Sequence, residues 1–117
     1  MVYKRIEVAD VEDVTVVRFR DRKILDESTI QEVGVELFNL VEVDHCQKLL
    51  LNFSRVDFMS SAALGRLLTL DRKVKSNQGK LKFSNLKAEI LEVFKITKLN
   101  KVFSIYNDEA DALAAYG

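Results

Sequence analysis

The residues that most often carry chemistry are few in this sequence. It contains one histidine and one cysteine, which stand next to each other as His45 and Cys46. A Cys-His nucleophile pair or a metal half-site would need these side chains to meet, but neighbours in sequence usually point apart, and no partner ligands lie nearby. We therefore interpret His45 as a surface residue and Cys46 as a small, half-buried side chain.

The carboxylates are scattered rather than paired. General acid–base catalysis needs two carboxyl groups that share a pocket and have shifted pKa values, and the spacing here forces no such pair. We expect the acidic residues at helix starts and on solvated faces: Glu32, Glu36, Glu42, Asp71, Glu89, Glu92, Asp108, Glu109 and Asp111. Glycine-rich phosphate loops and a zinc ligand set are also missing from the sequence. It therefore predicts no catalytic residues, no cofactor and no metal.

Positive and negative charges balance along the chain. Lysine plus arginine and aspartate plus glutamate each number 18, so the formal net charge is zero. A nucleic-acid-binding domain would show a positive excess, and we expect no such partner. Four basic residues gather on one expected helix, with Asp71 among them: Arg66, Arg72, Lys73 and Lys75. We interpret them as a solvated face or as the rim of a protein interface.

The most informative segment is VDFMSSAALGRLL, residues 56–68. An expected buried strand ends there, an aromatic residue and a methionine follow, and Ser60 and Ser61 open a helix. Capping alone explains one serine, because its oxygen accepts a hydrogen bond from an otherwise unpaired N–H group. Gly65 needs another reason, because a glycine within a helix costs ~1 kcal/mol relative to alanine. We expect another backbone or a partner protein to approach closely there.

The surrounding pattern predicts an α/β protein. Apolar and β-branched runs predict strands over residues 3–8, 14–19, 48–53, 80–84 and 101–106, and a polar turn over 10–13. Helical spacing of apolar residues predicts helices that begin near residues 28, 60, 86 and 108. The order β-β-α-β-α-β-α-β-α implies a mixed β-sheet packed with about four α-helices. The run over 48–53 hardly alternates, which is typical of a central strand that is buried on both faces.

Local signals mark where the helices begin and end. Ser28 and Gln31 have the spacing of a capping box at the start of the first helix. Gly79 is a stop signal for the second helix. Asn107 or Asp108 is expected to cap the last helix.

Length and composition are those of one globular domain. The chain has 117 residues, of which 48% are hydrophobic and 31% charged, enough to bury a core. No apolar run approaches the ~20 residues of a membrane span, and the N-terminus lacks the apolar segment of a signal peptide. The single cysteine leaves no internal disulfide and is typical of a reducing compartment. We expect one domain over residues 1–117, located in the cytoplasm, with no membrane partner.

The segment that follows the central strand resembles the phosphorylation loop of the STAS-domain anti-sigma factor antagonists. That family has a hydrophobic pair, then Asp-Ser-Ser/Thr-Gly, then Leu-Gly and aliphatic residues on a helix. Here the hydrophobic pair is Phe58-Met59, the serine that the family phosphorylates is Ser61, and Leu64-Gly65 and Leu67-Leu68 follow.

The resemblance covers nearly the whole chain, with differences inside the motif. Ile24-Leu25-Asp26 is similar to the family's Leu-Asp element, and residues 101–116 are similar to its closing strand and helix. The aspartate before the phosphoserine is Ser60 here, the following Ser/Thr is Ala62, and the motif glycine is Ala63.

The resemblance implies a partner-switching regulator rather than an enzyme. Unphosphorylated, the chain would bind an anti-sigma factor and so free a sigma factor for transcription. The anti-sigma factor, which has a histidine-kinase-like ATPase fold, would act as a serine kinase on Ser61 and dissociate, and a PP2C-type phosphatase would reset the switch. The implied partner surface consists of Phe58, Met59, Ser60, Ser61, Ala62, Gly65, Arg66 and Thr69.

Two alternatives stay open at this point. The phosphate acceptor could be Ser60 instead of Ser61. The chain could also be a constitutive STAS scaffold or a ligand-sensing module, in which the serine only caps the helix.

Overall fold

A mixed β-sheet forms the centre of the computed structural model, which describes residues 3–116. The sheet has five strands in the order β1-β2-β4-β6-β7. They are β1 (Ile6–Val11), β2 (Val14–Phe19), β4 (Lys48–Asn52), β6 (Lys80–Ser84) and β7 (Ser104–Tyr106). β1 runs antiparallel to β2, and every later pair is parallel, which confirms the expected hairpin followed by strand–helix units.

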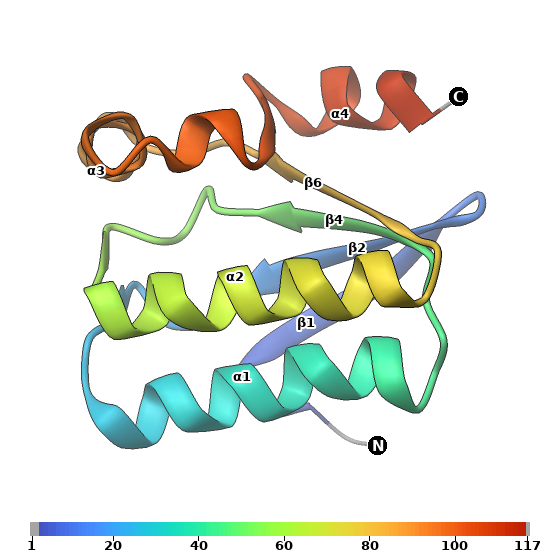
Figure 1. Cartoon of the computed structure of the whole chain (residues 1–117), viewed down its shortest axis with the longest axis horizontal. Helices are drawn as coiled ribbons and strands as arrows, with labels where there is room; N and C mark the ends of the chain where they lie inside the picture. Colours follow the sequence, from blue (N-terminus) through green and yellow to red (C-terminus); the bar gives the residue numbers. More distant parts are fainter. Residues whose placement is uncertain (1–2, 117) are drawn as a thin grey trace.

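Four α-helices cover the two faces of this sheet (Figure 1). They are α1 (Glu27–Glu42), α2 (Ser61–Ser76), α3 (Ala88–Ile96) and α4 (Glu109–Tyr116). The buried residues of α1, α2 and α3 belong to one large core cluster, and α1 and α2 lie side by side over it. The α4 helix packs on the opposite face, where Ala112 contributes to a smaller cluster. No helix within residues 3–116 combines the length and the apolar character that crossing a bilayer requires.

The central strand is buried on both faces, as its sequence predicts. Leu49 and Leu51 of β4 belong to the large core cluster, whereas Leu50 belongs to the smaller cluster under α4. All three leucine side chains are completely inaccessible to solvent. A strand with both faces covered needs apolar residues at successive positions, which is why the alternation is absent.

The N-terminal hairpin is shifted relative to the prediction. The expected strand over residues 3–8 is found at Ile6–Val11, and the expected turn over 10–13 shrinks to two residues, Glu12 and Asp13. Glu12 has φ 57°, the left-handed backbone that tight two-residue hairpins use. Residues that the sequence analysis assigned to the turn therefore lie at the end of the strand, where they are exposed to solvent.

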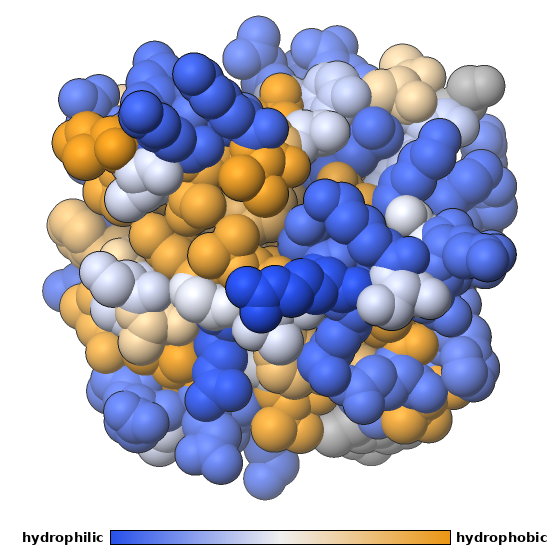
Figure 2. Space-filling view, viewed as in Figure 1, coloured by the Kyte–Doolittle hydropathy of each residue, from blue (hydrophilic) through white to orange (hydrophobic). Residues whose placement is uncertain are grey.

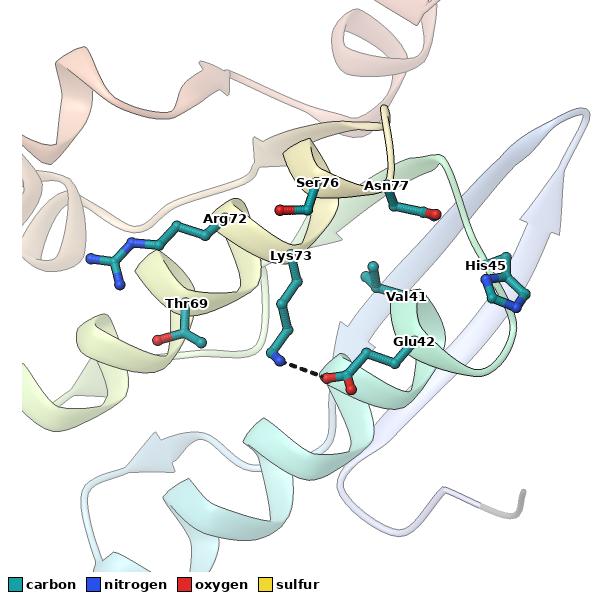
Figure 3. A pocket seen from close by; sticks show the side chains of 8 residues that line it. All are labelled: Val41, Glu42, His45, Thr69, Arg72, Lys73, Ser76 and Asn77. Atoms are coloured by element: carbon teal, nitrogen blue, oxygen red, sulfur yellow. Dashed lines mark ion pairs between the residues drawn. The ribbon is translucent and has the colours of Figure 1, made fainter.

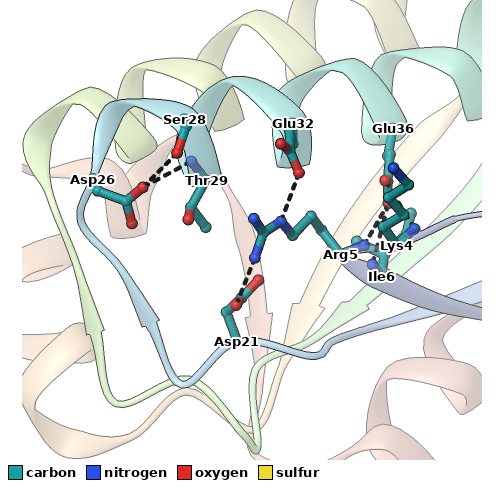
Figure 4. A network of polar contacts seen from close by, with 9 residues as sticks. All are labelled: Lys4, Arg5, Ile6, Asp21, Asp26, Ser28, Thr29, Glu32 and Glu36. Carbon is teal, nitrogen blue, oxygen red and sulfur yellow. Dashed lines mark hydrogen bonds and ion pairs between the residues drawn. The ribbon is translucent and has the colours of Figure 1, made fainter.

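The expected solvent exposure of the carboxylates is wrong for Glu36 and Asp71, which are 5% and 8% exposed. Figure 4 shows that the Glu36 carboxylate of α1 faces the start of β1. It accepts hydrogen bonds from the backbone N–H groups of Lys4, Arg5 and Ile6, at 2.9, 2.9 and 3.2 Å. These bonds compensate for its burial and attach β1 to α1.

The N-cap of α1 is Asp26, so the predicted capping role of Ser28 is wrong. The Asp26 carboxylate accepts hydrogen bonds from the Thr29 N–H at 3.1 Å and from the Ser28 hydroxyl at 2.8 Å (Figure 4). These bonds from Thr29 and Ser28 favour the ionised form and lower the pKa of Asp26 to about 2. The helix therefore begins with a negatively charged cap, which the helix dipole favours.

The second helix ends just before Gly79, as the sequence predicts, but Gly79 does not supply the left-handed backbone at this helix end. The helix ends at Ser76, and the residue with a left-handed backbone is Gln78, at φ 58°. Gly79 instead lies against the chain that enters β4, where a Cβ atom would come within 2.6 Å of the Gln47 carbonyl oxygen. The glycine is therefore required by a close backbone approach.

The C-terminal elements are shorter than expected. A 3-10 turn occupies Leu99–Lys101, so β7 begins only at Ser104 instead of at residue 101. Asp108 caps α4, since its carboxylate accepts a hydrogen bond from the Asp111 N–H at 2.8 Å. This confirms one of the two caps that the sequence offered.

A second, two-stranded sheet lies outside the main one, and the sequence did not predict it. β3 (Lys23–Ile24) pairs in parallel with β5 (Phe58–Met59). The pairing continues into the next residue, because the Ser60 N–H donates to the Ile24 carbonyl oxygen at 3.1 Å. Since β3 leads into α1 and β5 leads into α2, this ladder places the N-termini of the two helices side by side.

Candidate functional site

Two adjacent serines at the start of α2 have different surroundings. Ser60 is the N-cap: its backbone is extended, and its hydroxyl oxygen accepts a hydrogen bond from the Ala63 N–H at 3.2 Å. Ser61 is the first residue of the helix and is exposed, and no hydrogen bond to its hydroxyl forms within the described part of the chain. Capping therefore occupies Ser60 and leaves the Ser61 hydroxyl accessible.

The hydrophobic pair before the serines is held by the small sheet. Met59 is half-buried and packs against the large core cluster, whereas the Phe58 side chain is 49% exposed. The ammonium group of Lys23, opposite Phe58 in the β3–β5 ladder, lies 5.9 Å from the centre of the ring. One residue of the pair thus fixes the loop while the other presents an aromatic surface to solvent.

Asp57 fastens the same loop to two other segments. Its carboxylate forms an ion pair with Arg22 at 3.0 Å and a second, short ion pair with Lys87, the residue before α3. The hydrogen bond from Lys87 and the charges of Arg22 and Lys87 lower the pKa of Asp57, because they favour its ionised form. Asp57 therefore connects the loop before Ser61 with β3 and with the start of α3.

The remaining residues of the implied partner surface share one side of α2. Ser61, Ala62, Gly65, Arg66 and Thr69 fall within about 140° of each other on a helix with 3.6 residues per turn. The first three are exposed, and Arg66 and Thr69 are half-buried. The structure thus places these motif residues on one side of α2, directly after the strand that contains Phe58.

Gly65 does not face another part of the chain. A Cβ atom built at this position would meet no atom of the described residues within 4 Å. The expectation that a neighbouring backbone approaches Gly65 is therefore wrong, and the expectation that a partner protein approaches there stays a prediction. The neighbouring Arg66 side chain packs over Gly34 of α1. A Cβ atom added at Gly34 would lie 3.3 Å from the Cδ atom of Arg66.

His45 and Cys46 have the surroundings that the sequence predicts. His45 is exposed and Cys46 is half-buried, as expected, and the Cys46 Sγ atom accepts a hydrogen bond from the Thr15 hydroxyl at 3.4 Å. Within residues 3–116, no group of three or more histidine, cysteine, aspartate or glutamate side chains is placed to hold a metal ion.

A wide surface groove of about 570 Å³ runs between the C-terminal halves of α1 and α2 (Figure 3). It contains two of the basic residues that the sequence singled out, Arg72 and Lys73, and the predicted partner residue Thr69. The Lys73 ammonium forms an ion pair with Glu42 at 2.7 Å across the groove. Glu42, the carboxylate in this lining, is engaged in that ion pair, and the groove is an open charged surface.

Sequence reasoning missed two features that position the site. The β3–β5 pairing involves strands of two residues, which are too short to produce a hydrophobic period. The ion pairs of Asp57 join residues 35 and 30 positions apart, and nothing in the local pattern reports them.

The chain belongs to the STAS domain family, because the model of that family matches residues 5–112. Among curated proteins, it is 27% identical over 93 residues to BtrV of Bordetella bronchiseptica, a candidate anti-sigma factor antagonist; the match covers 80% of this chain and 79% of that protein. It is 23% identical over 109 residues to the anti-sigma F factor antagonist of Paenibacillus polymyxa, with 93% and 92% of the two chains covered.

A solved structure agrees with this assignment. The crystal structure of an anti-sigma factor antagonist from Mycobacterium paratuberculosis superposes with a TM-score of 0.82 at 25% sequence identity, covering 94% of this chain and 91% of that chain. The predicted α/β fold and the resemblance seen in the sequence are thereby confirmed. Both of these curated relatives are described as anti-sigma factor antagonists.

Proposed function

We propose that this protein is an anti-sigma factor antagonist and that phosphorylation of Ser61 controls its binding to the anti-sigma factor. The observation that carries the proposal is that the hydroxyl groups of the two serines have different surroundings. Ser60 is engaged in the N-cap of α2, whereas the Ser61 hydroxyl is exposed within the surface that the family motif indicates.

The surroundings of Ser61 suit both states of such a switch. A phosphate adds about −1.5 to −2 charge, and the first turn of α2 contains no acidic residue that would repel it. Ser61 lies at the N-terminus of a helix of 16 residues, where the dipole and unpaired N–H groups stabilise a negative group. The isolated domain therefore tolerates the phosphate.

The same phosphate weakens a complex. Within an interface, the phosphate loses its hydration and meets partner groups that were complementary to a small neutral hydroxyl. This loss of favourable free energy affects the complex but not the isolated domain. The neighbouring Ala62 and Gly65 carry little or no side chain, so a partner reaches Ser61 closely and is sensitive to any bulk added there.

The partner in this proposal is an anti-sigma factor with a histidine-kinase-like ATPase fold, which binds the unphosphorylated chain in the cytoplasm. It acts as a serine kinase on Ser61 and then dissociates, and a PP2C-type phosphatase restores the binding form. The chain itself supplies a surface and a phosphate acceptor and performs no catalysis.

Titration calorimetry with purified anti-sigma factors of this fold from the source organism tests the proposal. Ser61→Asp should reduce affinity at least tenfold, which requires only about 1.4 kcal/mol of lost interface free energy. Thermal melting of the isolated variant should match wild type, because the helix dipole favours the added charge. Ser61→Ala should bind normally and should receive no phosphate when the kinase and ATP are added.

A matched control separates position from charge. Ser104→Asp adds the same charge at an exposed serine on β7, and it should leave binding unchanged. Equal affinity of wild type and Ser61→Asp would exclude the switch and would favour a constitutive STAS scaffold or a ligand-sensing module. Phosphate found on Ser60 by peptide mapping would show that the alternative serine is the acceptor.

A further inference from the structure

An apolar hollow of about 120 Å³ lies next to the two serines, between the start of α2 and one side of α3. Leu64 and Ile90, which are 6% and 3% exposed, are its most deeply buried residues. Phe58, Met59 and Val93 complete its apolar lining. None of the residues that α3 contributes belongs to the surface that the family motif indicated.

The hollow belongs to a larger apolar area on one face of the molecule. Figure 2 shows hydrophobic residues gathered between α3 and α2, at the left of the view, with hydrophilic residues above them and to their right. Phe58 and Val93, on opposite sides of the hollow, are 49% and 38% exposed. Apolar surface that is collected at one place and rimmed by polar groups is typical of a protein contact.

The size of the hollow selects what fits. An apolar cavity of about 150 Å³ holds a benzene molecule, so a hollow of about 120 Å³ is large enough for one branched aliphatic side chain. A single side chain that fills a well-defined pocket at an interface is the usual form of a binding hot spot.

The charges at the rim add a second requirement. Of the two carboxylates that line the hollow, Asp57 is neutralised by Lys87 and Arg22. Glu89 is exposed and takes part in none of the ion pairs formed within residues 3–116. A partner that covers the hollow gains from a cation placed beside its apolar side chain.

We propose that the anti-sigma factor inserts a branched aliphatic side chain, flanked by a lysine or an arginine, into the hollow between α2 and α3. This inference rests on the proposed function, because it names where the same partner gains its affinity. Phe58 and Met59 belong both to the hollow and to the surface around Ser61, so one interface covers them together. The hollow anchors the complex, and the phosphate on Ser61 disrupts it from the adjoining turn.

The test measures binding of the purified histidine-kinase-like anti-sigma factors by titration calorimetry. Val93→Asp places a carboxylate in the mouth of the hollow and should weaken binding at least tenfold. Glu89→Lys reverses the charge at the rim and should weaken it severalfold, with a smaller dependence on salt than wild type shows. Both side chains are partly or fully exposed, and thermal melts verify that each variant folds.

Two substitutions on the same helix serve as matched controls. Ile96→Asp and Glu92→Lys make the same chemical changes at exposed positions outside the hollow, and both should bind within twofold of wild type. Normal binding by both Val93→Asp and Glu89→Lys, with binding lost in Ser61→Asp, would overturn the hollow as anchor and leave the switch intact. Loss of binding in Val93→Asp but not in Ser61→Asp would support the hollow and overturn the switch. Failure of every such factor to bind wild type would overturn both.

Discussion

Replacing glycine with alanine at three positions of this fold should change the stability of the protein in three different ways. Gly65 is in the interior of α2, and a Cβ atom there meets no described atom within 4 Å. At Gly34 of α1 the nearest atom is Cδ of the flexible Arg66 side chain, at 3.3 Å. At Gly79 the nearest atom is the carbonyl oxygen of Gln47, at 2.6 Å, and that oxygen accepts the Lys80 N–H.

The expected magnitudes follow from these contacts. Alanine in an open helical position stabilises a protein by about 0.5–1 kcal/mol relative to glycine, so Gly65→Ala should raise Tm by up to about 4 °C for a domain of this length. Gly34→Ala should stabilise the protein less than Gly65→Ala does, because the Arg66 side chain must shift to make room for the added methyl group. Gly79→Ala forces backbone apart and should cost about 1–3 kcal/mol, lowering Tm by about 4 °C or more.

Thermal and urea unfolding of the three variants, monitored by circular dichroism, measures this order directly. Lower stability of Gly65→Ala than of wild type would refute the conclusion that the position faces open solvent. A stable Gly79→Ala would refute the close approach to Gln47. The same Gly65→Ala protein should also bind the anti-sigma factor more weakly, and unchanged binding would show that this glycine has no part in the interface.

Three further changes test the polar contacts. Ser60→Ala removes the oxygen that accepts the Ala63 N–H and should lower the free energy of unfolding by about 1 kcal/mol in urea titrations, whereas an unchanged value would contradict its capping role. Glu36→Ala leaves three backbone N–H groups without their acceptor and should cost about 2–3 kcal/mol in the same assay; a loss below 0.5 kcal/mol, roughly the value of one exposed contact, would contradict the network. Because the pKa of Asp26 in the folded protein is about 2, below that of an unfolded chain, its ionised form stabilises the protein above pH ~4, and this contribution disappears as the pH falls towards 2. Stability curves of Asp26→Asn should therefore be flatter than those of wild type over that range, and parallel curves would refute the low pKa.

The sequence predicted those elements whose apolar residues follow a period or a continuous run. The run at Leu49–Leu51 predicted a strand buried on both sides, and the spacing of Ile30, Val33 and Leu37 predicted the buried side of α1. Features fixed by a single long-range contact were not predictable in this way. Glu36 occupies a position that the helical pattern assigns to solvent, and only the arrival of β1 explains its burial.

The candidate site was predicted in part. The motif indicated the first half of α2, and the structure assembles those residues into one surface. Which serine caps the helix depended on backbone geometry at Ser60, because two adjacent serines are equivalent as a pattern. The position of Val93 and Glu89 beside Phe58 and Met59 was not predictable, because α3 comes from a separate part of the chain.

The carboxylate of Glu36 has a consequence for how these molecules behave towards one another. β1 is an outer strand of the main sheet, and outer strands offer N–H groups with which another molecule can extend the sheet. At the beginning of β1 the donors of Lys4, Arg5 and Ile6 are already occupied by one side chain of the same chain. Glu36 thereby blocks edge-to-edge association at this end of the strand, and a protein that lacks it is expected to aggregate at concentrations where wild type stays in solution.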